Sequence, residues 1–261
     1  MVEKRNQRKT KGWNSLSKWY DGWVGDAGSR YHQEIGIPRI LSATNVVAGK
    51  RILDVGCGQG VLAPYVIAEG GVYVGIDVSH RLIEIARTRH PDMGQFVVAD
   101  AARLELTEAI ERMKFDVAIF LLSIQDMNPL DEVLESVSKT ITSNGTIVIF
   151  MTHPAFRVPR QSGWLFDETR GLVSRRVDSY LSNLNVPLKD YSRVGSGKSI
   201  SFHRPLQDYF QSLTRLGFMI DLLEEIPDST LYKKQISKQE RRASREIPLF
   251  LLLRAVKVGL P

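Results

Sequence analysis

The chain has 261 residues, of which 43% are hydrophobic and 25% charged, and its formal net charge is +6. This length allows one large domain or two small ones with a well-buried core, and the composition is unlike that of disordered, collagen-like or coiled-coil chains. Because Cys57 is the only cysteine, an intrachain disulfide, a CxxC zinc site and a cysteine-ligated iron–sulfur cluster are excluded. We expect a reducing compartment and predict no metal site.

The positive charge is concentrated in two segments. Residues 1–18 carry +5 and residues 233–246 carry +4, so the rest of the chain sums to −3. Such segments are commonly solvated, although they also suit an acidic partner such as RNA. The net charge therefore says little about what the body of the protein binds.

No segment is typical of a signal peptide or a membrane span. The basic N-terminal residues are followed by a polar and aromatic stretch, without the apolar run of about 7–15 residues that a signal peptide needs. The longest apolar runs, at 115–122 and 247–256, are shorter than the ~20 residues that cross a bilayer. We therefore expect a cytoplasmic protein without a membrane span.

From Arg51 onward, short apolar runs alternate with segments of helical periodicity. This alternation is typical of βαβ units with a parallel sheet. Ser79 is placed to cap a helix, because its hydroxyl can accept a hydrogen bond from an unpaired backbone amide. The predicted strands are 51–55, 72–76, 95–98, 115–122, 145–151, 218–225 and 248–256, and the predicted helices are 60–69, 79–90, 129–140 and 206–216.

Three segments do not fit this alternation. Residues 1–48 are rich in Trp and Tyr and precede the first strand, residues 152–205 form an irregular insertion, and residues 227–246 separate the last two strands. Structureless segments longer than about 12–15 residues in a compact domain are usually functional or mobile. We therefore expect substrate contacts in the insertion.

The first predicted strand runs into a glycine-rich loop, Ile52-Leu53-Asp54-Val55-Gly56-Cys57-Gly58-Gln59-Gly60. Glycines let backbone amides approach a ligand closely, and amides at the start of the following helix favour a negative or polar group. Asp77 ends the second strand, 23 residues after Asp54, where a carboxylate can accept hydrogen bonds from both hydroxyls of a ribose. Asp100 stands at the corresponding end of the third strand.

These residues resemble the cofactor site of the class I S-adenosylmethionine-dependent methyltransferases. The resemblance is close over about 50–151 and looser over the last two strands. It implies an α/β fold with a Rossmann-like, seven-stranded, mostly parallel sheet, an antiparallel last strand and helices on both faces. It also implies an N-terminal helical cap at 1–48 and a methyltransferase domain at 49–261, whose insertion after the fifth strand, 152–205, lies on the substrate side.

The resemblance also assigns a cofactor, S-adenosyl-L-methionine, and the residues that hold it. In the family, the glycine loop holds the methionine part, the acid after the second strand binds the ribose, and the acid after the third approaches the adenine amine. Asp54 resembles the carboxylate that organises the loop. The predicted cofactor-binding residues are Asp54, Gly56, Cys57, Gly58, Gly60, Asp77, Val78, Asp100, Ala101 and Leu122.

Two other interpretations of the loop stay open. A dinucleotide-binding Rossmann fold would need its third glycine at position 61, which is Val61, while Gly60 stands one residue early. The glycines could also serve only to make a tight turn. Asp77, Asp100 and the paired final strands favour the methyltransferase interpretation over both.

The absence of two motifs narrows the range of possible methyl acceptors. Cytosine C5 methylation needs a cysteine nucleophile, and Cys57 lies in the cofactor loop. The Asp/Asn-Pro-Pro-Tyr motif of DNA amino methylation is absent after the fourth strand, where the chain reads Leu122-Ser123-Ile124-Gln125-Asp126-Met127. Gln125, Asp126 and Met127 resemble the variable position of the family that faces cofactor and acceptor, and Gln125 is the predicted substrate-binding residue.

The predictions of catalytic and substrate-binding residues rest on weaker sequence signals. His153 follows the fifth strand and is the predicted general base, although it could instead be a loop histidine before Pro154. Tyr20 and Tyr31 are predicted to act in catalysis and substrate binding, respectively; the alternative is that they only anchor the cap. The remaining predicted substrate residues are Arg157, Trp164 and His203, with the alternative that Trp164 packs into the core while the arginines face water.

The leading hypothesis is methyl transfer to a small-molecule acceptor held between the cap and the insertion. The second is an RNA methyltransferase that uses the basic segments 1–18 and 233–246, although no stacking platform or recognised RNA-binding module accompanies them. The third is a non-catalytic cofactor-binding protein, which we would expect to have a broken glycine loop or to lack Asp77.

Overall fold

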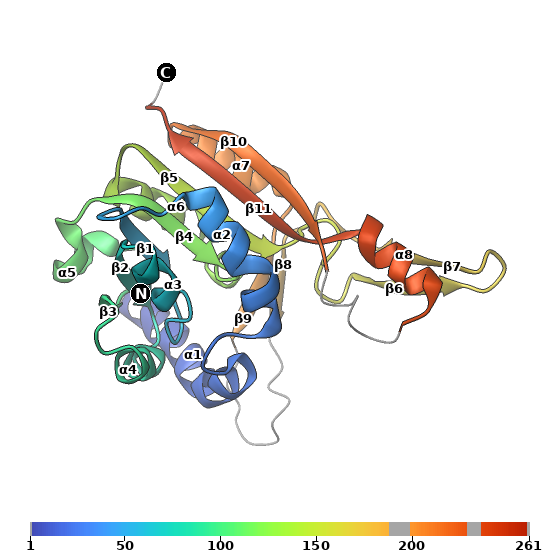
Figure 1. The fold of residues 1–261 in the computed structure, drawn as a ribbon, viewed down its shortest axis with the longest axis horizontal. Coiled ribbons are helices and arrows are strands. Elements are labelled where there is room, and N and C mark those ends of the chain that lie inside the picture. Colours follow the sequence, from blue (N-terminus) through green and yellow to red (C-terminus); the bar gives the residue numbers. More distant parts are fainter. Residues whose placement is uncertain (1, 188–198, 229–235, 260–261) are drawn as a thin grey trace.

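A seven-stranded sheet forms the centre of the molecule (Figure 1). The computed structural model describes residues 2–187, 199–228 and 236–259, and of residues 2–11 only the backbone. The strand order is β10-β11-β5-β4-β1-β2-β3. The strands are β1 (Arg51–Val55), β2 (Val72–Asp77), β3 (Gln95–Val98), β4 (Phe115–Leu121), β5 (Ile141–Thr152), β10 (Phe218–Pro227) and β11 (Pro248–Lys257).

The pairing confirms the predicted topology. The pairs β1–β2, β2–β3, β1–β4 and β4–β5 are parallel, whereas the last strand, β11, runs antiparallel to both β5 and β10. β5 begins at Ile141 rather than at the predicted Gly145, because Ile141 pairs with Phe115 at the start of β4. Backbone pairing thus extends this strand back past the glycine.

Helices cover both faces of the sheet, as predicted. On one face, α2 (Ile37–Thr44), α3 (Ala63–Ala68) and α4 (His80–Arg89) contribute Ile40, Val66 and Ile83 to one buried cluster. On the other, α5 (Glu108–Glu111), α6 (Leu130–Thr140) and α7 (Leu206–Arg215) supply a second cluster that includes Leu134 and Leu213. Strands buried on both sides explain the nearly continuous apolar runs of β4 and β5.

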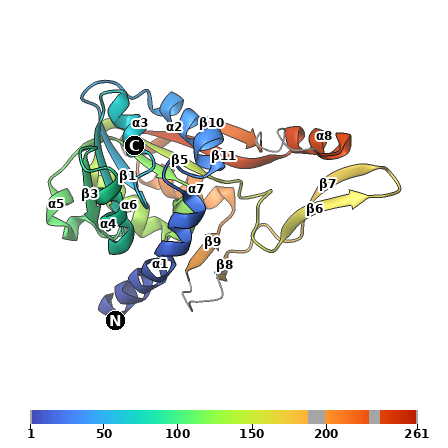
Figure 2. The same cartoon turned by 60° about the horizontal axis from the view of Figure 1, so that its bottom comes forward.

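The N-terminal segment is helical. Helix α1 (Val2–Val24) is followed by a π-helical turn, η1 (His32–Gly36), which continues into α2. α1 packs against α4 at the end of the sheet where the parallel strands finish (Figure 2). The predicted cap on α4 is present, since Ser79 Oγ accepts a hydrogen bond from the Leu82 amide at 3.3 Å.

The insertion after β5 is more regular than expected. It contains the antiparallel pairs β6 (Ser162–Asp167) with β7 (Leu172–Val177), and β8 (Leu184–Pro187) with β9 (Ile200–His203). The residues 188–198 of this insertion lie outside the described residues. In β6, Trp164, Leu165 and Phe166 are all exposed, so neither face of this strand is buried as in a core strand. The sequence of β6 therefore shows no clear alternation of apolar and polar residues.

The β6–β7 hairpin and helix α8 (Lys238–Glu246) extend away from the sheet, and α8 packs against β7 (Figures 1 and 2). β9, in contrast, returns to the end of the sheet where α1 lies (Figure 2). Among the described helices, none is both long and apolar enough to traverse a lipid bilayer.

Candidate functional site

A cavity of about 460 Å³ lies at the carboxyl ends of β1, β2, β3 and β4. Ligands of open α/β sheets bind at this edge, and the volume falls in the range of about 300–1,000 Å³ typical of small-molecule sites. Helix α1 and strand β9 contribute further parts of the wall. The lining residues are Gly12, Trp13, Tyr20, Gly56, Gly58, Ile76, Asp77, Val78, Leu82, Ala99, Asp100, Ala101, Leu122, Ser123, Asp126, Met127, Asn128, Val133, Ser199, Ile200 and Phe202.

Two glycines bring the loop after β1 into the cavity wall. Gly56 has a φ of +76°, and a Cβ there would lie 2.7 Å from Ser123 Cβ and from Met127 Cε. Gly58 has a φ of +55°, and its Cβ would lie 3.2 Å from Tyr20 Cε1. Both positions therefore require glycine for conformation and for space.

Gly60 has a different role from the other two glycines of the loop. Its φ is +81°, and a Cβ would lie 2.6 Å from Phe96 Cε1, but Gly60 does not line the cavity. It permits the loop to pack against the β3 side of the core. The structure thus divides the glycine motif into two residues of the cavity wall and one of the packing beneath it.

Asp77 presents a fixed carboxyl group to the cavity. Its Oδ2 accepts a hydrogen bond from the Gly58 amide at 3.0 Å, and its Oδ1 accepts one from the Ser79 amide at 2.8 Å. Burial raises the pKa of Asp77 to about 6, which these backbone hydrogen bonds oppose. Each oxygen retains acceptor capacity for a ligand hydroxyl. The geometry thus suits a vicinal diol, the part of a ribose that the sequence assigns to this residue.

Asp100, at the end of β3, also lines the cavity, and its Oδ1 accepts a hydrogen bond from the Ala102 amide at 3.1 Å. Val78, Ala101 and Leu122, three further residues of the predicted cofactor set, contribute apolar surface to the same wall. Seven of the ten predicted cofactor residues therefore meet around one space.

Asp54 and Cys57 belong to the same stretch of chain but are buried and do not line the cavity. Asp54 Oδ2 accepts a hydrogen bond from the Tyr73 hydroxyl at 2.7 Å, while Asp54 Oδ1 has no partner in the described part of the chain. Burial raises the pKa of Asp54 to about 7, against the effect of the Tyr73 hydrogen bond. Burial also raises the pKa of the Cys57 thiol.

Helix α1 covers the cavity with aromatic side chains. The Tyr20 ring lies over Gly58, and the Trp13 ring meets it edge-on with centroids 5.6 Å apart. Burial raises the pKa of the Tyr20 phenol, and the negative charge of Asp77 adds to this effect. Tyr20 is thus the one predicted catalytic or substrate residue that lines the cavity.

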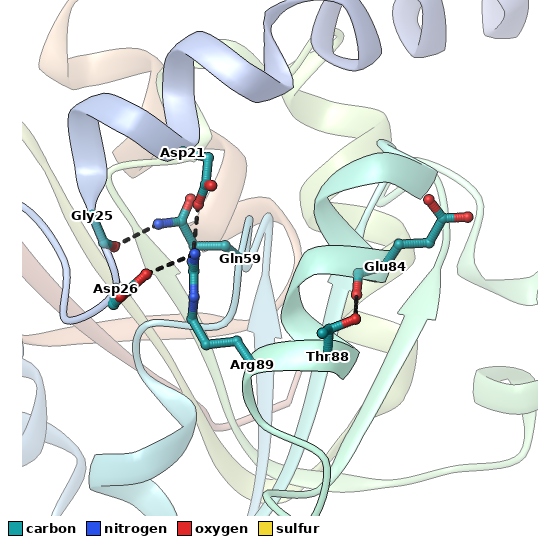
Figure 3. Close-up of polar contacts among 7 residues, drawn as sticks. All are labelled: Asp21, Gly25, Asp26, Gln59, Glu84, Thr88 and Arg89. Carbon is teal, nitrogen blue, oxygen red and sulfur yellow. Dashed lines mark hydrogen bonds and ion pairs between the residues drawn. The ribbon is translucent and has the colours of Figure 1, made fainter.

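The C-terminal end of α1 and the turn after it are tied to α4 and to the glycine loop by contacts of Arg89 and Gln59 that Figure 3 shows. Arg89 at the end of α4 forms ion pairs with Asp21 at 2.9 Å and with Asp26 at 2.7 Å. Gln59 Nε2, in the glycine loop, donates a hydrogen bond to the Gly25 carbonyl at 2.7 Å. These contacts hold the helix over the loop that forms the cavity wall.

His153 lies outside the cavity wall. Its Nδ1 accepts hydrogen bonds from the amides of Ala155 at 3.1 Å and Phe156 at 3.4 Å, and its Nε2 lies 3.0 Å from Glu225 Oε1. An Nδ1 that accepts backbone hydrogen bonds is unprotonated, which leaves the proton on Nε2, facing the carboxylate. Burial lowers the pKa of His153. This geometry fits the loop-histidine alternative better than a general base.

The other predicted substrate residues do not meet at the cavity. Arg157 lies over the Tyr31 ring, 5.9 Å from its centroid, and Trp164 on β6 stacks under Arg175 at 5.1 Å. His203 Nε2 lies 2.7 Å from the Tyr180 carbonyl oxygen. Gln125 Nε2 donates to the Leu122 carbonyl at 2.6 Å. None of these predicted residues is among those that line the cavity.

Several lining residues were not among the named cofactor, catalytic or substrate residues. Gly12 and Trp13 come from α1, Ser199, Ile200 and Phe202 from the end of the insertion, and Asp126 from the 3₁₀ turn η3 (Ile124–Asp126) after β4. The aromatic richness of the N-terminal segment was a signal for Trp13. The position next to Gln125 was a signal for Asp126, since the sequence indicated that this stretch faces the ligands.

Comparisons with known proteins agree with this geometry. A family model described as a methyltransferase domain matches residues 53–147. A provisionally named methyltransferase of Geobacillus sp. (strain WCH70) is 26% identical over 242 residues, which cover 84% of this chain and 95% of that protein. A crystal structure of an S-adenosylmethionine-dependent methyltransferase from Mesorhizobium loti is 26% identical, covers 84% of this chain and 96% of its own, and superposes with a TM-score of 0.66.

A ubiquinone biosynthesis O-methyltransferase of Paraburkholderia phymatum is 31% identical over 135 residues, which cover 52% of this chain and 49% of that protein. The chain thus spans about half the length of the ubiquinone enzymes that it matches. Sheet order, cavity position and these relatives agree with the family that the glycine loop and Asp77 indicated. The chain belongs to the class I S-adenosyl-L-methionine-dependent methyltransferases and is an enzyme that uses this cofactor.

Proposed function

We propose that the cavity binds S-adenosylmethionine and that the enzyme methylates a small-molecule acceptor held beside it. One observation carries this proposal: a space of about 460 Å³ is bounded on one side by Gly58 and Asp77 and covered on the other by α1 and β9. A covered cavity of this size suits two small molecules brought together better than an extended polymer.

The residues around the cavity fit the parts of the cofactor. The backbone of Gly56 and Gly58 would meet the methionine part, Asp77 would accept the ribose hydroxyls, and Asp100 would approach the adenine amine. The side chains of Val78, Ala101 and Leu122 would pack against the flat or apolar parts of the cofactor. Asp54, Cys57 and Gly60 would act from beneath, by holding the loop in this shape.

The bound cofactor supplies an electrophilic methyl group, which an acceptor atom takes by in-line attack. The protein's own part is to hold the acceptor aligned and to keep water out. Tyr20 and Trp13 from α1 and Phe202 from β9 would do this, because their rings line the cavity. His153, which lies outside the cavity, would stabilise the turn after β5 rather than remove a proton.

The proposal keeps the division into a cap, 1–48, and a catalytic domain, 49–261, with an acceptor-side insertion at 152–205. Both the cap and the insertion contribute to the cavity wall, the cap through α1 and the insertion through β9. The partly matching O-methyltransferases of ubiquinone biosynthesis support a small-molecule acceptor.

The RNA alternative has less support. The described part of the basic segment 233–246 lies mostly on α8, which sits on the projecting arm away from α1 (Figure 1). Residues 233 and 234, and the side chains of residues 2–11, lie outside the described residues. The hypothesis of a non-catalytic cofactor-binding protein predicts a broken glycine loop or the loss of Asp77, whereas both are intact.

The test is methyl transfer from S-adenosylmethionine labelled in its methyl group. The protein and the labelled cofactor are incubated with a small-molecule extract in one reaction and with total RNA in another, and the Asp77→Ala variant serves as the control. We expect label to enter the small-molecule fraction with the wild-type protein and not with the variant. Label entering RNA, or an unchanged result with the variant, would overturn the proposal.

A further inference from the structure

Asp126 is a cavity carboxyl that the cofactor assignment leaves unused. It lies on η3, directly after β4, and lines the cavity together with Met127 and Asn128. Asp77 and Asp100, the other two acids of the wall, sit at the ends of β2 and β3, where the ribose and adenine are assigned. Asp126 therefore faces the space on the β4 side, which the cofactor assignment leaves open to an acceptor.

The insertion holds Asp126 in place. Ser201 of β9 donates a hydrogen bond to the Asp126 carboxyl. Just after β9, Arg204 is 6% exposed, and its Nη2 donates to the Met127 carbonyl at 2.7 Å and to Asn128 Oδ1 at 3.0 Å. The end of the insertion is thus clamped to the turn that carries Asp126.

The charge of the wall limits what can bind there. Among the residues described as lining the cavity, the ionisable side chains are Tyr20 and the acids Asp77, Asp100 and Asp126, without Lys, Arg or His. An anionic acceptor would be repelled by these carboxylates in a desolvated space, whereas a cationic or hydrogen-bond-donating acceptor would be attracted. Arg157 of the insertion, one of the predicted substrate residues, is not part of this wall.

We propose that Asp126 binds the acceptor, by accepting a hydrogen bond from its amine or hydroxyl group, and takes up the proton that this group loses on methylation. The inference rests on the proposed function. The acceptor's N–H or O–H proton moves to an Asp126 oxygen. A lone pair on the acceptor nitrogen or oxygen forms the bond to the methyl carbon, and the electron pair of the carbon–sulfur bond stays on sulfur. The products are the methylated acceptor, a neutral thioether and a protonated Asp126.

Asp126 is suited to this exchange near neutral pH. Burial raises its pKa to about 7, while the Ser201 hydrogen bond and the positive charge of Arg204 act in the opposite direction. The other ionisable groups that interact with it are the Tyr20 phenol on α1 and the Tyr209 phenol on α7. An acid with a pKa near the working pH can both take up and release a proton.

The test uses ligand binding, which does not require the natural acceptor. Benzylamine, a cation, and benzoate, an anion with the same ring, are titrated into the full-length protein saturated with S-adenosylhomocysteine. The variants are Asp126→Asn, Asp126→Glu and, as a matched control, Asp178→Asn, which removes a surface carboxylate paired with Arg176 in the same insertion. Binding of S-adenosylhomocysteine reports on the cofactor site in each protein.

We expect the wild-type protein and Asp178→Asn to bind benzylamine at least about tenfold more tightly than benzoate, as one added charge interaction would give. Asp126→Asn should lose this preference while retaining S-adenosylhomocysteine, and Asp126→Glu should restore part of it. In the wild-type protein, benzylamine affinity should rise as pH increases through about 7, because Asp126 becomes ionised.

Benzoate binding as tightly as benzylamine, a preference that survives in Asp126→Asn, or no binding of either probe at millimolar concentrations would each overturn the inference. If Asp126→Asn fails to fold, the wild-type pH profile decides: an affinity that does not change through pH 7 refutes the role. Failure of the wild-type protein to bind S-adenosylhomocysteine would instead refute the proposed function on which the inference rests.

Discussion

Replacing Asp54 by asparagine should change how the stability of the protein depends on pH. Asp54 is 2% exposed, and burial raises the pKa of its carboxyl from 3.8 to about 7 in the folded protein. Between these two values the unfolded chain has lost a proton that the folded protein still holds, so the free energy of unfolding falls as pH rises. At about 1.4 kcal/mol per pKa unit, the full loss is on the order of 4 kcal/mol.

The Asp54→Asn variant cannot ionise, but its side-chain oxygen can still accept the Tyr73 hydroxyl. Urea unfolding of both proteins, without cofactor, should show the variant gaining stability relative to wild type as pH increases from about 4 to about 7. Tyr73→Phe removes the hydrogen bond that favours the ionised carboxyl, so it should extend the decline to higher pH. A difference between Asp54→Asn and wild type that is constant across this range would refute the reasoning.

Three further outcomes follow from the contacts of the site. Gly58→Ala places a Cβ 3.2 Å from the Tyr20 ring at a positive φ, so S-adenosylmethionine affinity measured by calorimetry should fall by about tenfold; unchanged affinity would contradict the placement of the loop. Arg89→Ala should increase hydrogen exchange at the end of α1 and weaken cofactor binding a few-fold, and exchange equal to wild type would show that the ion pairs do not hold the helix. His153→Gln should lower the free energy of unfolding by about 1–3 kcal/mol and leave cofactor affinity unchanged; intact stability with abolished methyl transfer would restore the general-base hypothesis.

The sheet and the proposed cofactor side of the cavity could be predicted because their sequence signals are local. Each parallel strand is a short apolar run, and its carboxyl end is followed by a glycine or an acid. The carboxyl ends of parallel strands meet at one edge, so Gly58, Asp77 and Asp100 had to lie close together once the strands were placed.

The opposite side of the cavity, the proposed acceptor side, depends on tertiary contacts that the sequence does not display. Trp13 and Phe202 stand nearly two hundred residues apart and meet only because α1 and β9 both fold over the same edge. Gln125 and Asp126 are neighbours in one 3₁₀ turn, yet Gln125 turns back to the Leu122 carbonyl while Asp126 lines the cavity. Position along the chain indicated this turn but not which of its side chains faces the ligand.

The most direct test of the account is calorimetric titration of S-adenosylmethionine into the wild-type protein and the Asp77→Ala variant. We predict one site per chain in the wild-type protein and, because the variant loses the fixed carboxyl that we propose accepts the ribose hydroxyls, affinity lower by at least about tenfold. Equal affinity of the two proteins would contradict the claim that the cavity under α1 is the cofactor site.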